Sequence, residues 1–265
     1  MELLISLVPR FVLGRRTSSK TTHDDDVDRH DDAPTPQRRR RHTSDDTLVV
    51  HAGERRRARA ISGVEAEATD YSIATPIVTG TARWFRDSAD LVAFREGGGR
   101  RWRWHSFEYA RYGNPTVEVL EDKISAMEKA EATIVTSSGM NAIVVTLLAV
   151  VPPGGHTTFV DLDDMEALQS VLDQGNVTMF YADSLTNPHL KCVDVRRVAE
   201  LCHQRGALVC IDSTLASPIN QKPLTLGADV VLHSITKYIA GHHDVIAGCV
   251  SGSEELISRI RELAS

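Results

Sequence analysis

The sequence predicts an α/β fold, with a mostly parallel β-sheet covered by helices on both faces. Three observations lead to this prediction. After residue 131, short apolar runs rich in Val and Ile alternate with helical segments, as they do in strand–helix–strand units. The runs are apolar throughout rather than at every second residue, which is typical of strands buried on both faces. Glycines and N-capping side chains stand between runs and helical segments, where helices stop and start.

The boundaries of the helical segments can be read from single residues. Pro115 after Asn114 opens one helix, and Asp194 and Gly206 cap and end another. The segment 140–151 is apolar on all sides, so we expect a buried helix there. The predicted strands cover 132–136, 157–162, 177–182, 207–211, 230–232 and 245–250, and the predicted helices begin near 115, 140, 163, 195 and 254.

Composition excludes several classes of protein. The 265 residues are 42% hydrophobic and 25% charged, which is globular composition with room for one large domain or two smaller ones. A net charge of −6 argues against nucleic-acid binding, which needs a basic face. We expect no membrane span, because no apolar stretch reaches about 20 residues. The four cysteines lack CxxC spacing, so we expect no metal site and a reducing compartment.

Residues 1–46 are expected to form a disordered N-terminal extension. Acidic runs and Arg38–Arg41 dominate this segment, and it cannot bury enough apolar area to offset chain entropy. The segment is too acidic for a clear organelle transit peptide, so we expect a cytoplasmic protein, with the plastid as the alternative. Residues 97–104, three glycines followed by alternating Arg and Trp, are expected to form an exposed loop.

Polar or turn-forming residues follow four of the predicted strands. Gly139, Asn187, Asp212 and the stretch 234–237 each come after an apolar run. The carboxyl ends of parallel strands share one edge of a sheet, which is where open α/β sheets bind ligands. Gly139 also opens a helix, whose free N–H groups favour a phosphate. If no other polar group accompanies Gly139, the alternative is that it is simply a glycine required by the turn.

Lys237, just past a strand, has two hydroxyl residues close before it, Ser234 and Thr236. A lone lysine there would be a surface amine. Asp212 at the end of a buried strand needs a partner, either a backbone amide or helix N-terminus, or a protonated ring nitrogen. A phosphate-binding helix start, an acid and a lysine together are what pyridoxal phosphate requires, since the lysine forms the imine and the acid keeps the ring nitrogen protonated.

Several sequence blocks carry a family resemblance. They resemble the Cys/Met-metabolism family of pyridoxal-phosphate enzymes, and within it the plant-type cystathionine γ-synthases most closely. The resemblance runs from about residue 47 to the C-terminus. The matching blocks, in family order, are residues 109–116 (YARYGNPT), 138–140 (SGM), 183–188 (DSLTNP), 212–214 (DST), 234–238 (SITKY) and 241–242 (GH).

The resemblance implies an aspartate-aminotransferase-like large domain and a role for each matching residue. Lys237 would hold the cofactor and later move protons. Asp212 would pair with the pyridine nitrogen and Asn187 with the phenolic oxygen of the cofactor. The cofactor phosphate would be bound by the amides of Gly139 and Met140 and by Ser234 and Thr236. Tyr109 and Arg111 would reach the cofactor phosphate of a neighbouring subunit. The resemblance therefore implies a homo-oligomer, commonly a dimer of dimers.

The implied reaction is γ-replacement on small amino-acid substrates, in transsulfuration and methionine biosynthesis. An activated homoserine ester, O-phosphohomoserine in plant-type enzymes, would lose its γ leaving group, and the thiolate of cysteine would add to give cystathionine. Cystathionine or methionine γ-lyase activity is a close alternative. A second hypothesis, from another class, is an inactive fragment that only binds the cofactor or associates with intact subunits.

The chain departs from the family pattern at two places. Between His156 and Thr157 the family has a further strand and helix, with the tyrosine that stacks on the cofactor ring. We also expect this chain to lack the family's C-terminal domain, with its arginine for the substrate carboxylate. We therefore expect residues 47–116 to form an N-terminal arm and cofactor-loop segment and 117–265 an incomplete cofactor-binding domain, from a truncated or mis-spliced gene product.

Overall fold

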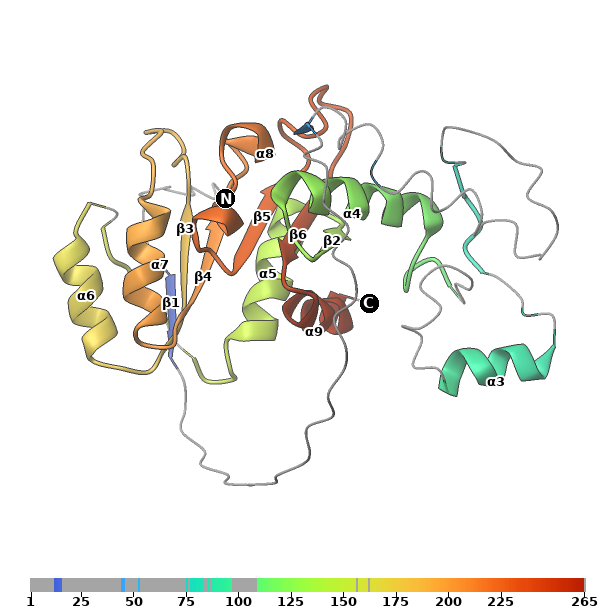
Figure 1. Ribbon diagram of the computed structural model, residues 1–265, viewed down its shortest axis with the longest axis horizontal. Coiled ribbons are helices and arrows are strands. Elements are labelled where there is room, and N and C mark those ends of the chain that lie inside the picture. Colours follow the sequence, from blue (N-terminus) through green and yellow to red (C-terminus); the bar gives the residue numbers. More distant parts are fainter. Residues whose placement is uncertain are drawn as a thin grey trace, which may run out of the picture.

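The computed structural model describes residues 12–15, 44–45, 52, 75, 77–82, 85, 87–96, 109–155, 157–161 and 163–264. The expected loop at 97–104 and most of the expected N-terminal extension lie outside these residues. Within the described part, a six-stranded sheet has the order β1-β3-β4-β5-β6-β2 (Figure 1). Its strands are β1 (Val12–Arg15), β2 (Ala132–Thr136), β3 (Val177–Asp183), β4 (Leu208–Asp212), β5 (Val230–Ser234) and β6 (Gly248–Gly252).

The sheet is mixed, with one dominant strand direction. Strand β4 pairs parallel with both β3 and β5. Strand β6 pairs antiparallel with β5 and with β2, so β2 runs in the same direction as β3, β4 and β5. The carboxyl ends of these four strands therefore lie on one edge of the sheet. The α/β class predicted from the sequence is confirmed.

Helices cover both faces of the sheet. They are α3 (Ser88–Glu96), α4 (Pro115–Glu128), α5 (Gly139–Val150), α6 (Met165–Asp173), α7 (Val195–His203), α8 (Ser217–Asn220), α9 (Glu254–Ala264) and the 3-10 helix η1 (Pro223–Leu226). On one face α6 and α7 pack on β3 and β4 around buried Phe180. On the other face α5 and α9 pack on the central strands around Leu232 and Val250. Helix α4 covers β2 and β6 through Ile124 and Cys249.

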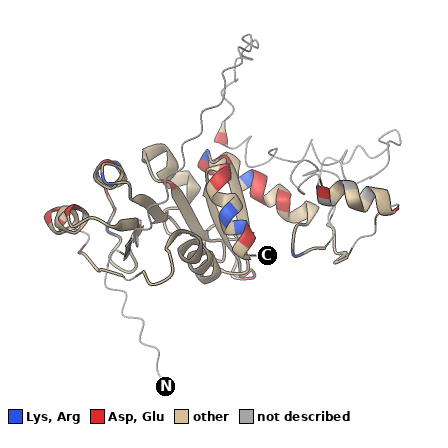
Figure 2. Ribbon diagram, turned by 90° about the horizontal axis from the view of Figure 1, so that it is seen from below, with Lys and Arg blue, Asp and Glu red and all other residues tan. Residues whose placement is uncertain are grey.

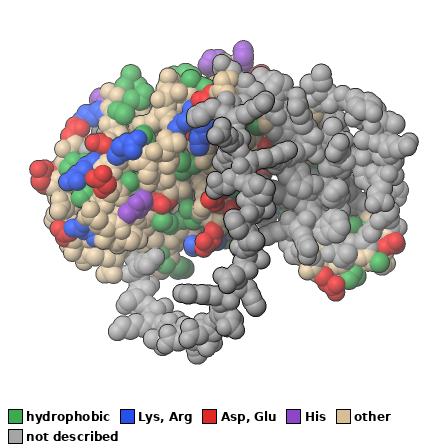
Figure 3. All heavy atoms as spheres, viewed as in Figure 1, with side chains coloured by type: hydrophobic (Ala, Val, Ile, Leu, Met, Phe, Trp, Pro, Cys, Tyr) green, Lys and Arg blue, Asp and Glu red, His purple; other side chains and the backbone are tan. Residues whose placement is uncertain are grey.

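Charged residues lie mainly on the covering helices and in loops. Figure 2 shows them on α4, α6 and α7, while α5 carries none. On the face shown in Figure 3, acidic and basic side chains are interspersed rather than gathered into one basic patch. Within the described residues, no helix is both long and apolar enough to cross a membrane.

The prediction of a strand at 157–162 is wrong for the residues described there. Residues 157–161 form no strand of the sheet, although Val160 is buried in the core beside α6 and α7. A strand needs a hydrogen-bonding neighbour, and the free edge of β3 is taken by β1, which pairs antiparallel with it from Val12 opposite Tyr181. Strand β1 lies inside the segment expected to be disordered, so that expectation does not hold for residues 12–15.

Helix α5 is buried on one face only, which corrects the expectation of a helix buried all round. Met140, Val144 and Leu148 are 63%, 42% and 66% exposed and recur every fourth residue. Ala142 and Val145 on the opposite side are buried against the sheet. The predominantly apolar helix therefore has two apolar surfaces, one packed against the sheet and one exposed on this chain.

Candidate functional site

The turn between β2 and α5 is pressed against the end of β5. Ser138 caps α5 by accepting a hydrogen bond from the Asn141 amide at 3.0 Å. A Cβ placed on Gly139 would lie 2.6 Å from Cβ of Ser234. The close approach requires glycine and sets the first turn of α5 beside Ser234. Because amides of a first helical turn have no partner inside the helix, this junction has the donors that a phosphate needs.

Asp212 is held at the end of β4 by Thr214. Its Oδ1 accepts hydrogen bonds from the Thr214 amide at 3.0 Å and from the Thr214 hydroxyl at 2.5 Å. The same hydroxyl oxygen accepts the Ser234 amide at 2.8 Å. Thr214 thus ties the carboxylate at the end of β4 to the serine at the end of β5, and it fixes one carboxylate oxygen while the other faces Tyr181.

Lys237 lies in the turn that follows β5, and its side chain is exposed. Its amide donates to the Ser234 carbonyl at 3.1 Å, and its carbonyl accepts the Gly241 amide at 2.9 Å. The neighbouring Thr236 hydroxyl donates to the Ala247 carbonyl and accepts the Ala247 amide, both at 3.1 Å. Thr236 therefore braces the turn that presents Lys237, and in this arrangement its single O–H is not directed to a phosphate.

The loop after β3 carries Asn187, which is exposed. The Ser184 amide donates to the Asp212 carbonyl at 2.9 Å, so the start of this loop is fixed to the end of β4. Thr186 closes the loop by accepting the Lys191 amide on its hydroxyl at 3.0 Å. Asn187 is thus at the same sheet edge as Asp212 and Lys237, as the sequence predicted.

Tyr109 and Arg111 form a separate group before α4. The Arg111 guanidinium lies 5.3 Å from the Tyr109 ring centre and 5.4 Å from that of Tyr112. The Ala110 amide donates to the Thr81 carbonyl at 2.8 Å. No hydrogen bond or ring contact among the described residues joins Tyr109 or Arg111 to the strand-end group. Their expected role at a neighbouring subunit stays a prediction.

Sequence reasoning missed two side chains that contact this edge. Tyr181 on β3 is half-buried, and its hydroxyl faces both Asp183 and Asp212. Burial, and then the charges of Asp212 and Asp183, raise the pKa of Tyr181 well above its usual range. Burial first and the Asp212 charge second raise the pKa of Asp183 to about 6. A tyrosine two residues before a strand-end acid in an otherwise apolar run was the signal available in the sequence.

The raised pKa of Asp183 makes the stability of the fold depend on pH. Its folded value of about 6 exceeds the ordinary 3.8, so the folded chain binds the extra proton, and the free energy of unfolding falls as pH rises from about 4 to 7. The loss is about 2 kcal/mol, after reduction for the partial exposure of the group. Urea unfolding of the chain and of Asp183→Asn across this range should show the fall only with the aspartate; parallel curves would contradict it.

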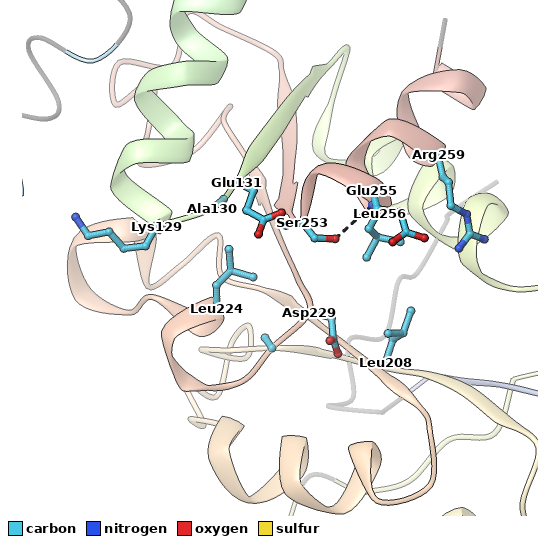
Figure 4. Close-up of a pocket in the computed structure, with 12 residues that line it drawn as sticks. Lys129, Ala130, Glu131, Leu208, Leu224, Asp229, Ser253, Glu255, Leu256 and Arg259 are labelled. Carbon is cyan, nitrogen blue, oxygen red and sulfur yellow. Dashed lines mark hydrogen bonds between the residues drawn. The ribbon is translucent and has the colours of Figure 1, made fainter. Parts of the chain in front are cut away.

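A pocket lies at the opposite edge of the sheet. Its volume is about 410 Å³, and residues such as Leu208 at the start of β4, Asp229 before β5 and Arg259 on α9 line it (Figure 4). Asp229 is already engaged there by the Val209 amide at 2.7 Å and by His203 Nε2 at 2.9 Å. The pocket is therefore separate from the group around Lys237.

The chain was compared with known proteins. The family model described as Cys/Met metabolism PLP-dependent enzyme matches residues 46–159 and 150–265. The chain belongs to this family. Pyridoxal phosphate is the cofactor of the family, and the resemblance inferred from the sequence blocks is confirmed.

Two of the relatives that match this chain have different activities in their names. The chain is 46% identical over 242 residues to cystathionine gamma-synthase 1, chloroplastic, of Arabidopsis thaliana, covering 82% of this chain and 41% of that protein. It is 39% identical over 218 residues to L-methionine gamma-lyase of Fusobacterium nucleatum subsp. polymorphum, covering 72% of this chain and 53% of that one. The chain thus spans about half the length of these relatives.

A solved structure has the same architecture. Cystathionine gamma synthase from Xanthomonas oryzae pv. oryzae, in complex with cystathionine, is 30% identical with a TM-score of 0.69, over 84% of this chain and 58% of that chain. This likeness confirms the predicted aspartate-aminotransferase-like large-domain fold.

The strand-end residues fit the family's cofactor. The close approach of Gly139 to Ser234 leaves no room for a side chain between the first turn of α5 and β5, as a main-chain phosphate site requires. Asp212 has one oxygen fixed by Thr214 and the other facing inward toward Tyr181. An exposed primary amine, Lys237, follows the neighbouring strand. These groups match the phosphate, the ring nitrogen and the aldehyde of pyridoxal phosphate.

Proposed function

We propose that this chain is the cofactor-binding part of a γ-replacement enzyme that joins O-phosphohomoserine and cysteine to give cystathionine. The observation that carries the proposal is the gathering of Gly139, Asp212 and Lys237 on one sheet edge in a chain 46% identical to a cystathionine gamma-synthase. Matches to methionine gamma-lyases support γ-elimination as the second candidate. The homo-oligomer and the compartment, cytoplasmic or plastid, stay predictions.

Each residue of the site has a chemical task in this reaction. The first amides of α5, with Ser234, bind and orient the cofactor phosphate. Asp212 holds a proton on the ring nitrogen, because a carboxylate at that position favours the charged form of the ring. When bound, pyridoxal phosphate supplies an electron sink for the bond broken at the substrate's α-carbon. Lys237 Nζ would hold the aldehyde carbon of the cofactor, and the same amine would take and return protons at the substrate's α- and β-carbons.

The cofactor's attachment to Lys237 tests the proposal directly. The chain should be purified with pyridoxal phosphate, its visible spectrum recorded, and the bound cofactor fixed with borohydride for peptide mass analysis. We expect a visible absorption band and a cofactor mass on the peptide containing Lys237. Both should be lost in Lys237→Ala and kept in Lys191→Ala, which removes an exposed lysine from the loop after β3. Absence of the band and the mass from every variant would refute cofactor chemistry in this chain.

Product analysis separates the two candidate reactions. The loaded chain should be incubated with O-phosphohomoserine and cysteine, and separately with methionine. Cystathionine formed in the first mixture supports γ-replacement, and a 2-oxo acid with a released thiol in the second supports γ-elimination. A loaded chain that turns over neither mixture would leave the inactive cofactor-binding fragment as the correct description.

A further inference from the structure

One phenolic hydroxyl lies between two carboxylates at the sheet edge that carries Asp212 and Lys237. The Tyr181 hydroxyl is 3.4 Å from Oδ1 of Asp183 and 3.3 Å from Oδ2 of Asp212. Asp183 and Asp212 are register partners on the parallel strands β3 and β4. A phenol has a single O–H to donate. Tyr181 can therefore make one full hydrogen bond, to one carboxylate or the other, or share its proton weakly between them.

The two carboxylates differ in what else stabilises their charge. Asp212 receives two further hydrogen bonds on Oδ1, from the amide and the hydroxyl of Thr214. Asp183, among the described residues, has Tyr181 as the hydrogen-bond donor to its side chain. Burial and the Asp212 charge accordingly raise the pKa of Asp183 to about 6, and the Tyr181 bond opposes that rise. Asp183 therefore gains a proton at a pH closer to neutral than an ordinary aspartate does.

Within the described part of the chain, the elements packed around Tyr181 add no charged side chain that would compete with the interaction between Asp183, Tyr181 and Asp212. Residue 181 packs with the core cluster that includes α5 residues Ala142 and Val145, and α5 carries no charged residue. Cys210 on β4 is fully buried, and burial, with the nearby Asp212 charge, raises the pKa of its thiol well above its usual range, so it stays neutral. In such surroundings a change of charge on one carboxylate is felt strongly by the other.

We propose that Asp183 is a positioning residue that acts through the Tyr181 hydroxyl to set how well Asp212 receives a protonated ring nitrogen. The inference rests on the proposed function, since the ring is that of pyridoxal phosphate. When Asp183 carries a proton, Tyr181 donates fully to Asp212 and occupies its inward oxygen. When Asp183 is ionised, Tyr181 turns toward it, the inward oxygen of Asp212 is open, and a second negative charge lies near the cationic ring.

The expected consequence is a cofactor affinity that rises with pH through the titration of Asp183. The probe should be 4-deoxypyridoxine 5′-phosphate, which keeps the ring nitrogen and the phosphate but has no aldehyde, so that attachment to Lys237 does not enter. Its dissociation constant should be measured by calorimetry between pH 5 and 8. The probe's own titrations affect every variant equally, so the informative quantity is the difference between variants.

We expect the ratio of affinities at pH 7.5 and pH 5 to be about tenfold larger for the unmodified chain than for Asp183→Asn, which corresponds to coupling of one pKa unit. Asp183→Glu keeps the carboxylate and should restore most of the pH dependence. Tyr181→Phe removes the hydroxyl that links the two carboxylates, so it should reduce the pH dependence of affinity toward that of Asp183→Asn. If Asp183 had only a structural role, Asp183→Asn would change the affinity for the probe by the same factor at every pH.

The outcomes separate this inference from the proposed function. Binding of the probe with the same pH dependence in the unmodified chain and in Asp183→Asn overturns the inference and leaves the proposed function standing. No binding of the probe at any pH overturns both. Urea unfolding of each variant without ligand confirms that it is folded. Loss of binding in Asp183→Asn at every pH, with Asp183→Glu equally inactive, also overturns the inference, because the carboxylate would then not be what matters.

Discussion

Replacing Glu128 with alanine is expected to lower the free energy of unfolding by about 3 kcal/mol, the upper end of the range for leaving a buried polar group without its hydrogen-bond partner. Glu128, at the end of α4, is 0% exposed and bonds Nε2 of His233 on β5, 1% exposed, at 2.7 Å. The truncation leaves the imidazole buried without this partner and opens a cavity beside it. Urea denaturation followed by circular dichroism would measure the loss.

A matched substitution tests whether burial is the cause. Glu255 lies in the exposed first turn of α9, and Glu255→Ala should change the unfolding free energy by less than about 1 kcal/mol. Replacing the pair together, as Glu128→Met with His233→Leu, should recover part of the stability, because apolar side chains of similar volume often replace a buried pair at little cost. Equal losses for Glu128→Ala and Glu255→Ala would contradict the assigned role.

Replacing Gly139 with alanine is expected to weaken pyridoxal phosphate binding at least tenfold, about 1.4 kcal/mol. The added Cβ would lie 2.6 Å from Cβ and 2.9 Å from Oγ of Ser234, so the start of α5 must move away from β5. This movement separates the amides from the serine in the group expected to hold the phosphate. The strain should also cost about 1 to 3 kcal/mol of stability.

Gly80→Ala is the control for that change, because a Cβ on Gly80 meets nothing within 4 Å. The dissociation constant of the cofactor, measured from its visible spectrum, should be unchanged in this variant. An unchanged constant in Gly139→Ala as well would show that the junction of α5 and β5 does not bind the phosphate.

The general plan of the site could be predicted because it depends on local order along the chain. Gly139, Asn187, Asp212 and Lys237 each follow an apolar run, and strands that run in the same direction bring their ends to one edge. The expected role of Thr236 at the cofactor phosphate could not be judged from its position in the sequence alone. In the structure its hydroxyl is hydrogen-bonded to the main chain of Ala247.

What could not be predicted depends on contacts between distant segments. His233 and Glu128 are neighbours only because α4 packs on β2 and β6, on the side of β5 away from β4. The two acceptors of Tyr181 follow from the register of β3 against β4. The strand expected at 157–162 failed for a similar reason, since apolar residues fit a core position as well as a sheet position, and Val160 took the former.

The pairing of β1 with β3 has a consequence for the order in which the chain assembles. Val12 must meet Tyr181, so during synthesis β1 leaves the ribosome long before its neighbour exists. Closing so large a loop carries a high entropic cost, whereas β3, β4 and β5 follow one another closely and can pair as they emerge. Among the described strands, β1 is made first, and we expect it to be the last to pair.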